Sequence, residues 1–510
     1  MRLKNKSNWT YAALALLWLL VSLPLFLNYC MEGTELQYHL LRMEGLKDGL
    51  LSGQFPVRIQ PNWMGGAGYA VSIFEGDAFL LFPALLRMVG LPVQTTYSLT
   101  IAMLNLTALW IAYNSFKGIF KDPVIGLIGS LLYVFAPYRL DTLYAKADLG
   151  ESIAICFLPM LMYGCYRFLT QDLKKPENKY IWAHIALGLS ALFQAHLTLF
   201  EIAVFWFALL CVLSWRKLFN KETVYQLSKL ACAFLVLNAW MLIPLADYLI
   251  RKDLRFKWGS SAIQSKGVYW LHYLTTFFVN GDSREFSQQR MAGTAALGVG
   301  FALTCMALVY VWMLFTHKYR EERKTEGLWR FASKVAVVSA VAIWMSTLYF
   351  PWDYLRSKNR MVQVLTVGLK SPAEFLPVVT VGLCFLGCVI FWQIKKTEVQ
   401  KVFAIAMAVM LGLSLTTSTV LLVDYMENRS SLSINDDEDL DTMQILDGDY
   451  LFLTPGENER NMHTDPSIWY WRGSEVVSVV GWFVLGAGWM AVMWKKHRKE
   501  ECDVEKVRDI

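Results

Sequence analysis

Two titratable residues, Glu35 and His39, lie four positions apart in a stretch that could carry chemistry. The apolar residues around them recur at helical spacing: Leu36, Leu40, Met43, Leu46 and Leu50. The carboxylate and the imidazole therefore share one face of a predicted helix, where they can act as a general base and its hydrogen-bonding neighbour. The alternative is an ordinary surface pair on an amphipathic helix in the headgroup region of a membrane.

The composition indicates a polytopic membrane protein. Of the 510 residues, 55% are hydrophobic and only 18% are charged, with a mean hydropathy of +0.36. Apolar runs long enough to cross ~30 Å of hydrocarbon recur along the chain. The predicted spans are 9–29, 96–116, 122–137, 151–169, 180–195, 197–215, 228–249, 293–316, 331–350, 372–394, 400–423 and 476–494.

A thirteenth apolar segment, residues 71–90, decides whether the number of membrane crossings is even or odd, and so whether the two termini lie on the same side. It carries Glu75, Asp77, Pro83 and Arg87, which disfavour a full crossing. With this segment lying along the membrane surface, the lysine and arginine groups around 117–121, 167–179, 216–221, 318–330 and 395–396 fall on the side of the two termini, as the positive-inside rule requires. We therefore predict twelve spans in an all-α fold, with both termini cytoplasmic.

This topology leaves the segments 30–95, 138–150, 250–292, 351–371 and 424–475 on the outer side. We expect a transmembrane domain over 1–423 with juxtamembrane helices in its first outer loop, a small extracytoplasmic subdomain over 424–475, and a last span with a basic tail over 476–510. The subdomain contains an acidic run at 436–439 and a strand-like run at 450–453.

Polar residues from distant loops converge on this outer side. Asp148 and Glu151, at the start of a predicted span, are candidate acids beside Glu35 and His39. The predicted substrate-binding residues are Arg58, Arg139, Lys146, His196, Arg356 and Arg360. Arginine can clasp a phosphate with two hydrogen bonds, and a carboxylate can take a proton from a hydroxyl. Helix capping, interface packing and contacts with anionic headgroups are the structural alternatives.

The stretch from Gly33 to Leu50, with Gly53–Arg58 and Gly68-Tyr69, resembles bacterial integral membrane proteins of a family named "6-pyruvoyl-tetrahydropterin synthase-related". Pro137–Leu140, Gly150-Glu151 and Phe350–Trp352 strengthen the resemblance. The name does not describe the chemistry here, because this chain has none of the ligands of the soluble zinc enzyme.

The architecture is similar to that of the C-type (GT-C) glycosyltransferases. That resemblance implies that Glu35 is the acid of the first outer loop and that Asp148 or Glu151 is the second acid. Related proteins carry aspartate where this chain has Glu35, so its carboxylate sits about one C–C bond further out, a displacement large enough to affect catalysis.

Together these features predict a membrane enzyme that moves a sugar from a polyprenyl-phosphate donor to an extracytoplasmic glycan, lipid or protein. The alternative is a flippase, transporter or assembly partner for lipid-linked saccharides. No nucleotide-binding, zinc-protease or nucleic-acid motif is present in the sequence. No cofactor is assigned, although paired carboxylates are compatible with magnesium or manganese.

Overall fold

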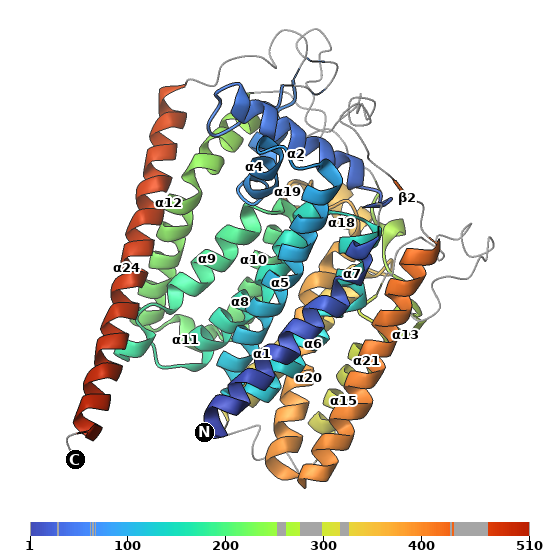
Figure 1. The fold of residues 1–510 in the computed structure, drawn as a ribbon, viewed down its shortest axis with the longest axis vertical. Coiled ribbons are helices and arrows are strands. Elements are labelled where there is room, and N and C mark those ends of the chain that lie inside the picture. The colour runs from blue at the N-terminus through green and yellow to red at the C-terminus, as the bar shows by residue number, and fades with distance from the viewer. Residues whose placement is uncertain are drawn as a thin grey trace.

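The computed structural model is an all-α polytopic membrane protein (Figure 1). It describes residues 2–27, 30–61, 63, 66, 68–251, 262–275, 298–316, 326–428, 431–432 and 468–508. The longer helices are α1 (Arg2–Val21), α5 (Val93–Phe120), α6 (Pro123–Val134), α8 (Leu149–Thr170), α9 (Ile181–Phe193), α10 (Leu197–Val212), α12 (Lys221–Arg251), α15 (Phe301–Phe315), α17 (Gly327–Ser346), α20 (Leu376–Thr397), α21 (Gln400–Asn428) and α24 (Trp469–Arg508). Each of the twelve predicted spans falls on one of these helices.

Not every one of these helices is long enough to cross a bilayer. Among the described residues, six are long and apolar enough, namely Val93–Phe120, Leu149–Thr170, Lys221–Arg251, Gly327–Ser346, Pro372–Thr397 and Gln400–Glu427. A seventh span is formed if Pro123–Val134 and Pro137–Ala145 are taken together, although they are bent by 53°. Other predicted spans fall on shorter apolar helices such as α10 and α15, below the ~20 residues that a perpendicular crossing needs.

Short helices gather at one end of the bundle. They include α2 (Leu36–Leu51), α3 (Val71–Phe74), α4 (Leu81–Met88), α7 (Pro137–Leu140), the π-helical turn η2 (Asp141–Ala145), α18 (Trp352–Lys358), α19 (Arg360–Leu365) and the 3₁₀ helix η7 (Pro372–Phe375). Segment 71–90 contains two of them, as expected for a juxtamembrane segment. Both termini lie at the opposite end (Figure 1).

The remaining described elements are small. They are the 3₁₀ helices η1 (Leu23–Phe26), η3 (Pro176–Asn178) and η5 (Gln264–Lys266), the helical turns α11 (Trp215–Leu218) and α13 (His272–Thr275), and the antiparallel strands β1 (Cys30–Met31) and β2 (Ser431–Leu432). The predicted subdomain over 424–475 is described only in part. Helix α21 extends to Asn428 and α24 already begins at Trp469, whereas the acidic run 436–439 and the strand-like run 450–453 lie outside the described residues.

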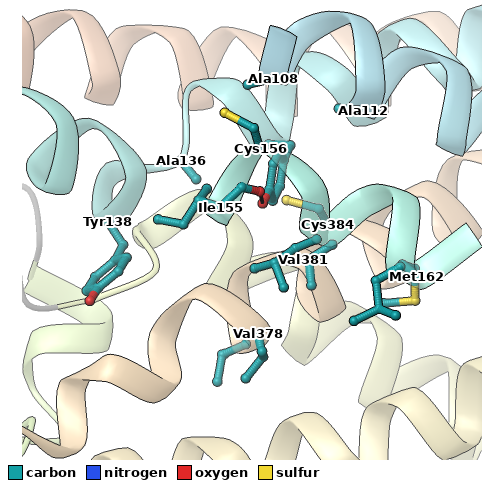
Figure 2. Packing of buried hydrophobic residues seen from close by; sticks show 14 of the residues in the cluster. Ala108, Ala112, Ala136, Tyr138, Ile155, Cys156, Met162, Val378, Val381 and Cys384 are labelled. Atoms are coloured by element: carbon teal, nitrogen blue, oxygen red, sulfur yellow. Dashed lines mark hydrogen bonds between the residues drawn. The ribbon is translucent and has the colours of Figure 1, made fainter. Parts of the chain in front are cut away.

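Helix α20 lies at the centre of the bundle and packs against α6, α8, α15 and α17. Glycines bring its neighbours close. A Cβ atom on Gly382 would lie 2.2 Å from the Ser339 hydroxyl oxygen, and one on Gly387 would lie 2.6 Å from the Met306 sulfur. Figure 2 shows this core around Cys156 and Cys384, with Ala108 and Ala112 of α5 on one side. Dense packing of this kind fixes the helix ends that carry the polar residues.

Candidate functional site

The first outer loop is docked onto the residues that precede α8. The backbone N–H of Glu35 donates to the Lys146 carbonyl oxygen at 2.9 Å. Gly33 allows this approach, because a Cβ atom there would lie 2.6 Å from the Ala147 Cβ and 2.8 Å from the Lys146 carbonyl oxygen. The N-terminus of α2 is therefore held against the second outer loop, although more than one hundred residues separate them.

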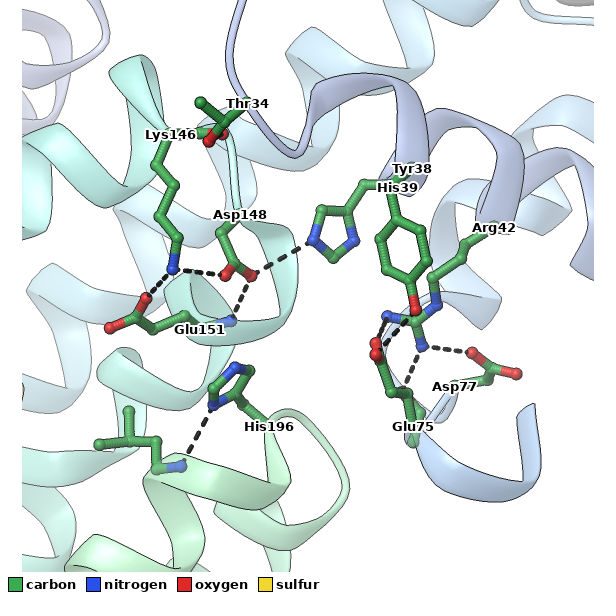
Figure 3. Close-up of polar contacts among 12 residues, drawn as sticks. Thr34, Tyr38, His39, Arg42, Glu75, Asp77, Lys146, Asp148, Glu151 and His196 are labelled. Carbon is green, nitrogen blue, oxygen red and sulfur yellow. Dashed lines mark hydrogen bonds and ion pairs between the residues drawn. The ribbon is translucent and has the colours of Figure 1, made fainter. Parts of the chain in front are cut away.

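This docking brings His39 to Asp148 (Figure 3). The Nε2 atom of His39 lies 3.2 Å from Oδ1 of Asp148, and both side chains are buried. Asp148 is the N-cap of α8, and the same Oδ1 accepts the Glu151 backbone N–H at 2.9 Å. The cap fixes the carboxylate, and the carboxylate in turn fixes the imidazole.

Lys146 joins the two carboxylates. Its Nζ atom lies 2.9 Å from Oδ2 of Asp148 and donates to Oε2 of Glu151 at 2.7 Å, and Oε1 of Glu151 accepts the Tyr138 hydroxyl at 2.8 Å. Burial by itself raises the pKa of Asp148, but the Lys146 ammonium and the hydrogen bond from His39 outweigh burial and hold that pKa well below its ordinary value. Burial likewise opposes the charge of Lys146, but Asp148 and Glu151 raise its pKa well above normal. Asp148 and Lys146 therefore remain charged at neutral pH.

The predicted pairing of Glu35 with His39 is corrected by the structure. Glu35 is the half-exposed N-cap of α2 and makes no capping hydrogen bond with its side chain, while His39 turns toward Asp148. Four residues of separation place two side chains on one helix face, but they do not determine whether a third element offers a better partner. Here that partner comes from α8.

His196 lies at the short turn between α9 and α10, beside the Asp148 cluster in Figure 3. Its Nδ1 atom accepts the Leu199 backbone N–H at 3.2 Å, which makes it the N-cap of α10. The side chain is within electrostatic range of Asp148. Its Nε2 atom is therefore the ring nitrogen left for a ligand.

A second ionic cluster lies one turn further along α2. The buried guanidinium of Arg42 donates to Glu75 and to Asp77, each at 2.7 Å, and the Tyr38 hydroxyl donates to Glu75 at 2.7 Å. Burial opposes ionisation of Glu75, but Arg42 and Tyr38 hold its pKa below the ordinary value. Between the two acids, Gly76 is pressed against the Gln194 carbonyl oxygen, where a Cβ would lie only 2.1 Å away. This cluster therefore fixes the first loop to the turn that carries His196.

The structure adds two residues that the sequence prediction did not include, Glu374 and Lys370. Glu374 is buried, and its Oε1 atom accepts the backbone N–H groups of Lys370 and Ser371, each at 3.1 Å. Its Oε2 atom has no hydrogen-bond partner among the described residues, and the carboxylate lies within electrostatic range of Lys146 and Glu151. The Ser-x-x-Glu pattern of a capping box at Ser371–Glu374 was the available sequence signal.

Two predicted substrate-binding arginines, Arg139 and Arg58, donate hydrogen bonds to other parts of the protein. Arg139 donates to the Val134 carbonyl oxygen at 3.1 Å and to the Asn105 side chain at 2.8 Å. Arg58 donates to the Trp240 carbonyl oxygen at 2.8 Å and to Glu475 at 3.0 Å. Both guanidinium groups are buried. Arg139 connects α6 to α5, and Arg58 connects α12 to α24.

The other two predicted arginines lie on the short helices after α17. Arg356 is buried on α18 and Arg360 is exposed on α19. Neither forms an ion pair with Asp148 or Glu151 in the described part of the chain. Their contribution to a substrate site stays a prediction.

The described residues contain no group of three or more His, Cys, Asp or Glu side chains that could hold a metal ion. The paired acids Asp148 and Glu151 already share the Lys146 ammonium. An ammonium placed between two carboxylates occupies the position that a divalent cation would need. We therefore derive no step through magnesium or manganese.

Known proteins of similar fold were found among membrane sugar transferases. A structure of the oligosaccharyltransferase of Archaeoglobus fulgidus with Zn and sulfate superimposes with a TM-score of 0.50 at 12% identity, covering 92% of this chain and 61% of that protein. A variant of the mycobacterial arabinofuranosyltransferase AftD gives a TM-score of 0.50 at 13% identity, covering 84% of this chain and 29% of that protein. The chain shares their membrane fold.

Sequence comparisons add little to the structural ones. An uncharacterized protein of Lactococcus lactis subsp. cremoris is 22% identical over 158 residues, which is 30% of this chain and 26% of that protein. No protein-family model matches the sequence. The resemblance to the family named after the pterin synthase stays a prediction. The chain spans less than two thirds of the length of each of these three proteins.

Proposed function

We propose that this protein is a membrane glycosyltransferase that moves a sugar from a polyprenyl-phosphate donor to an extracytoplasmic acceptor in a cell-envelope glycan, lipid or protein. The observation that carries the proposal is the buried pairing of His39 with Asp148, next to the Lys146 bridge to Glu151. It combines a base, a fixed anion and a cation at the end of a membrane bundle, where a lipid-linked substrate meets an aqueous acceptor.

In this mechanism His39 takes the proton from the acceptor hydroxyl. Asp148 accepts the Nε2–H of the imidazole and so fixes the tautomer in which Nδ1 carries the lone pair. Nδ1 is buried and has no hydrogen-bond partner within the described ranges. The ionised Asp148 then stabilises the imidazolium that forms. Glu35, half-exposed one turn away, orients the acceptor.

The departing phosphate needs positive charge close to the sugar. The exposed Lys370 flanks the carboxylate cluster and is assigned to this role, while His196, whose Nδ1 accepts the Leu199 N–H, can donate a hydrogen bond to the phosphate from Nε2. Lys146 is held between two acids and instead keeps the local charge from becoming too negative for an anionic donor. The shared fold with two membrane sugar transferases supports the proposal at the level of architecture.

The test is sugar transfer in membranes that contain matched amounts of each variant. Losing a general base or its orienting carboxylate removes about 10²–10⁴-fold in rate, so we expect losses of this order in His39→Gln and Asp148→Asn. Asp172→Asn, an exposed acid at the opposite end of α8, is the matched control and should keep full transfer. Unchanged transfer in both site variants would exclude the assigned roles.

The flippase alternative requires charged groups that line a route between the two membrane faces. Asp247 of α12 is instead paired with Arg251 in the last helical turn at 2.7 Å. The described residues thus offer no specific observation in favour of a through-path at this position, and we develop only the enzymatic proposal.

A further inference from the structure

A group of cations lies at the end of the bundle opposite the candidate site. Helices α8 and α10 both begin at the site, at Asp148 and His196, and α8 is 22 residues long, or roughly 33 Å. Where they end, three segments meet. They are the turn after α8 at Gln171, the short helix α11, and the first turns of α17.

The two lysines of this group are held by neutral oxygen atoms. Lys334 of α17 donates from Nζ to the hydroxyl oxygen of Ser214 at 2.7 Å, and Ser214 lies three residues before Lys217. Lys217 donates from Nζ to the Gln171 carbonyl oxygen at 2.7 Å. Each lysine is half-buried, and Arg330, exposed one turn before Lys334, adds a third positive charge. We call Lys217, Arg330 and Lys334 the α11 cation cluster.

Among the described residues, this cluster has no carboxylate in ion-pair contact, and Asp172 is the acid whose charge acts on Lys217. Burial lowers the pKa of Lys217 to about 8; Asp172 opposes the shift, and the Lys334 charge adds to it. None of the three cations forms an ion pair with a carboxylate in the described part of the chain. The lysines at the end of α20, on the same side of the bundle, are ion-paired with carboxylates. Lys395 pairs with Asp122, and Lys396 pairs with Glu326.

The surroundings of the cluster fit the edge of a bilayer. Trp215 is 56% exposed and Phe219 is 79% exposed, and they flank the cations on and after α11. The Arg216 guanidinium lies over the Trp215 ring at 5.6 Å. Exposed aromatic rings beside basic residues are typical of the level at which lipid headgroups lie. Lysine stems can lie along the apolar surface while their ammonium groups reach that level.

We propose that the α11 cation cluster is a binding site for the phosphate headgroup of an anionic phospholipid in the leaflet next to the termini. A lipid phosphate brings negative charge to the cluster and can accept hydrogen bonds from Lys217 and Lys334 together, while its acyl chains lie against the exposed apolar residues of α10 and α11. This site is separate from the proposed sugar-transfer site and does not depend on it.

The experiment compares lipid retention by the full-length protein in native mass spectrometry after exchange into micelles with equal amounts of phosphatidylglycerol and phosphatidylcholine. We expect about a tenfold preference of the wild type for phosphatidylglycerol, and its loss in Lys217→Gln/Lys334→Gln. The control, Lys174→Gln/Lys175→Gln, removes the same charge from exposed positions of the neighbouring turn and should keep the preference.

Three results would overturn the proposal. The first is equal loss in the control, which would show that diffuse surface charge attracts the lipid. The second is no preference in the wild type. The third is displacement of the lipid by millimolar inorganic phosphate alone, which would assign the site to a free anion. The variant Lys217→Arg/Lys334→Arg keeps both positive charges and should keep the preference for phosphatidylglycerol. That result would show that the glutamine variant loses the preference through lost charge and not through misfolding.

Discussion

Lys146 illustrates how one cation holds a buried acidic site together. It contacts both Asp148 and Glu151, and Glu151 is 1% exposed. Removing one partner of a buried ionic group leaves charge without compensation, which costs about 3 kcal/mol or more. We therefore expect Lys146→Met to unfold at clearly lower temperature in detergent.

The double variant Lys146→Met/Glu151→Gln tests this reason for the loss. Without the Lys146 ammonium, the carboxylates of Asp148 and Glu151 repel each other. The second substitution removes one of these two carboxylates, so part of the lost stability should return. If the two substitutions were independent packing defects, their stability losses would add. Thermal unfolding of the wild type, both single variants and the double variant completes the cycle. Additive losses would contradict the electrostatic explanation.

The sequence identified several residues of the cluster as candidates, but not the contacts that they make with one another. Lys146, Asp148 and Glu151 lie within six positions at the start of a helix, and the sequence assigned Lys146 to the substrate, whereas the structure places its ammonium between the two acids. Arg139 lies seven positions before Lys146, but its partner Asn105 belongs to another helix, and no local pattern indicates that contact. Glu374 was missed for the same reason, since its neighbours Lys146 and Glu151 are more than two hundred residues away.

At the scale of elements, the structure depends on close contacts between short segments. Gly76, between α3 and α4, touches the backbone of Gln194 between α9 and α10, and a Cβ atom there would lie 2.1 Å from the carbonyl oxygen. Because backbone atoms cannot move aside cheaply, Gly76→Ala should cost about 1–3 kcal/mol of stability and reduce any activity that needs His196 in place.

Gly412 provides the matched control for this substitution. It lies inside α21, where an added Cβ atom would meet no other atom within 4 Å. Alanine is the better helix former, so Gly412→Ala should stabilise the protein by about 0.5–1 kcal/mol. Thermal unfolding measures both variants, and a stability loss in Gly412→Ala equal to that in Gly76→Ala would contradict the contact argument.

Hydrophobic runs predicted where helices occur, but not where they bend or end. The span predicted over 122–137 ends as a helix at Val134 and continues after Pro137 at 53°. The proline signal was present in the sequence, yet the direction of a bend depends on the packing of α5 and α20 around it. The same limit applies to α1, which ends at Val21, eight residues before the predicted boundary.

For the whole molecule, the main prediction is that the site and the termini lie on opposite sides of the membrane. The structure places them at opposite ends of the bundle, and the distribution of lysine and arginine predicts that the termini are cytoplasmic (Figure 1). In a Cys502→Ser background, an impermeant maleimide should label Thr34→Cys in intact cells and Lys174→Cys only after permeabilisation. Both positions are exposed. The reverse pattern would invert the topology.

The π-helical turn at Asp141–Ala145 limits which deletions this sequence can tolerate during evolution. A π turn corresponds to one residue inserted into an α-helix, and this insertion directly precedes Lys146 and Asp148. Deleting one residue from the turn would leave the hydrophobic pattern of the neighbouring spans intact. It would nevertheless rotate α7, which carries Tyr138, by about 100° relative to Lys146. A short gap in an otherwise alignable homologue would therefore mark a protein that kept the membrane architecture while losing the hydrogen bond from Tyr138 to Glu151.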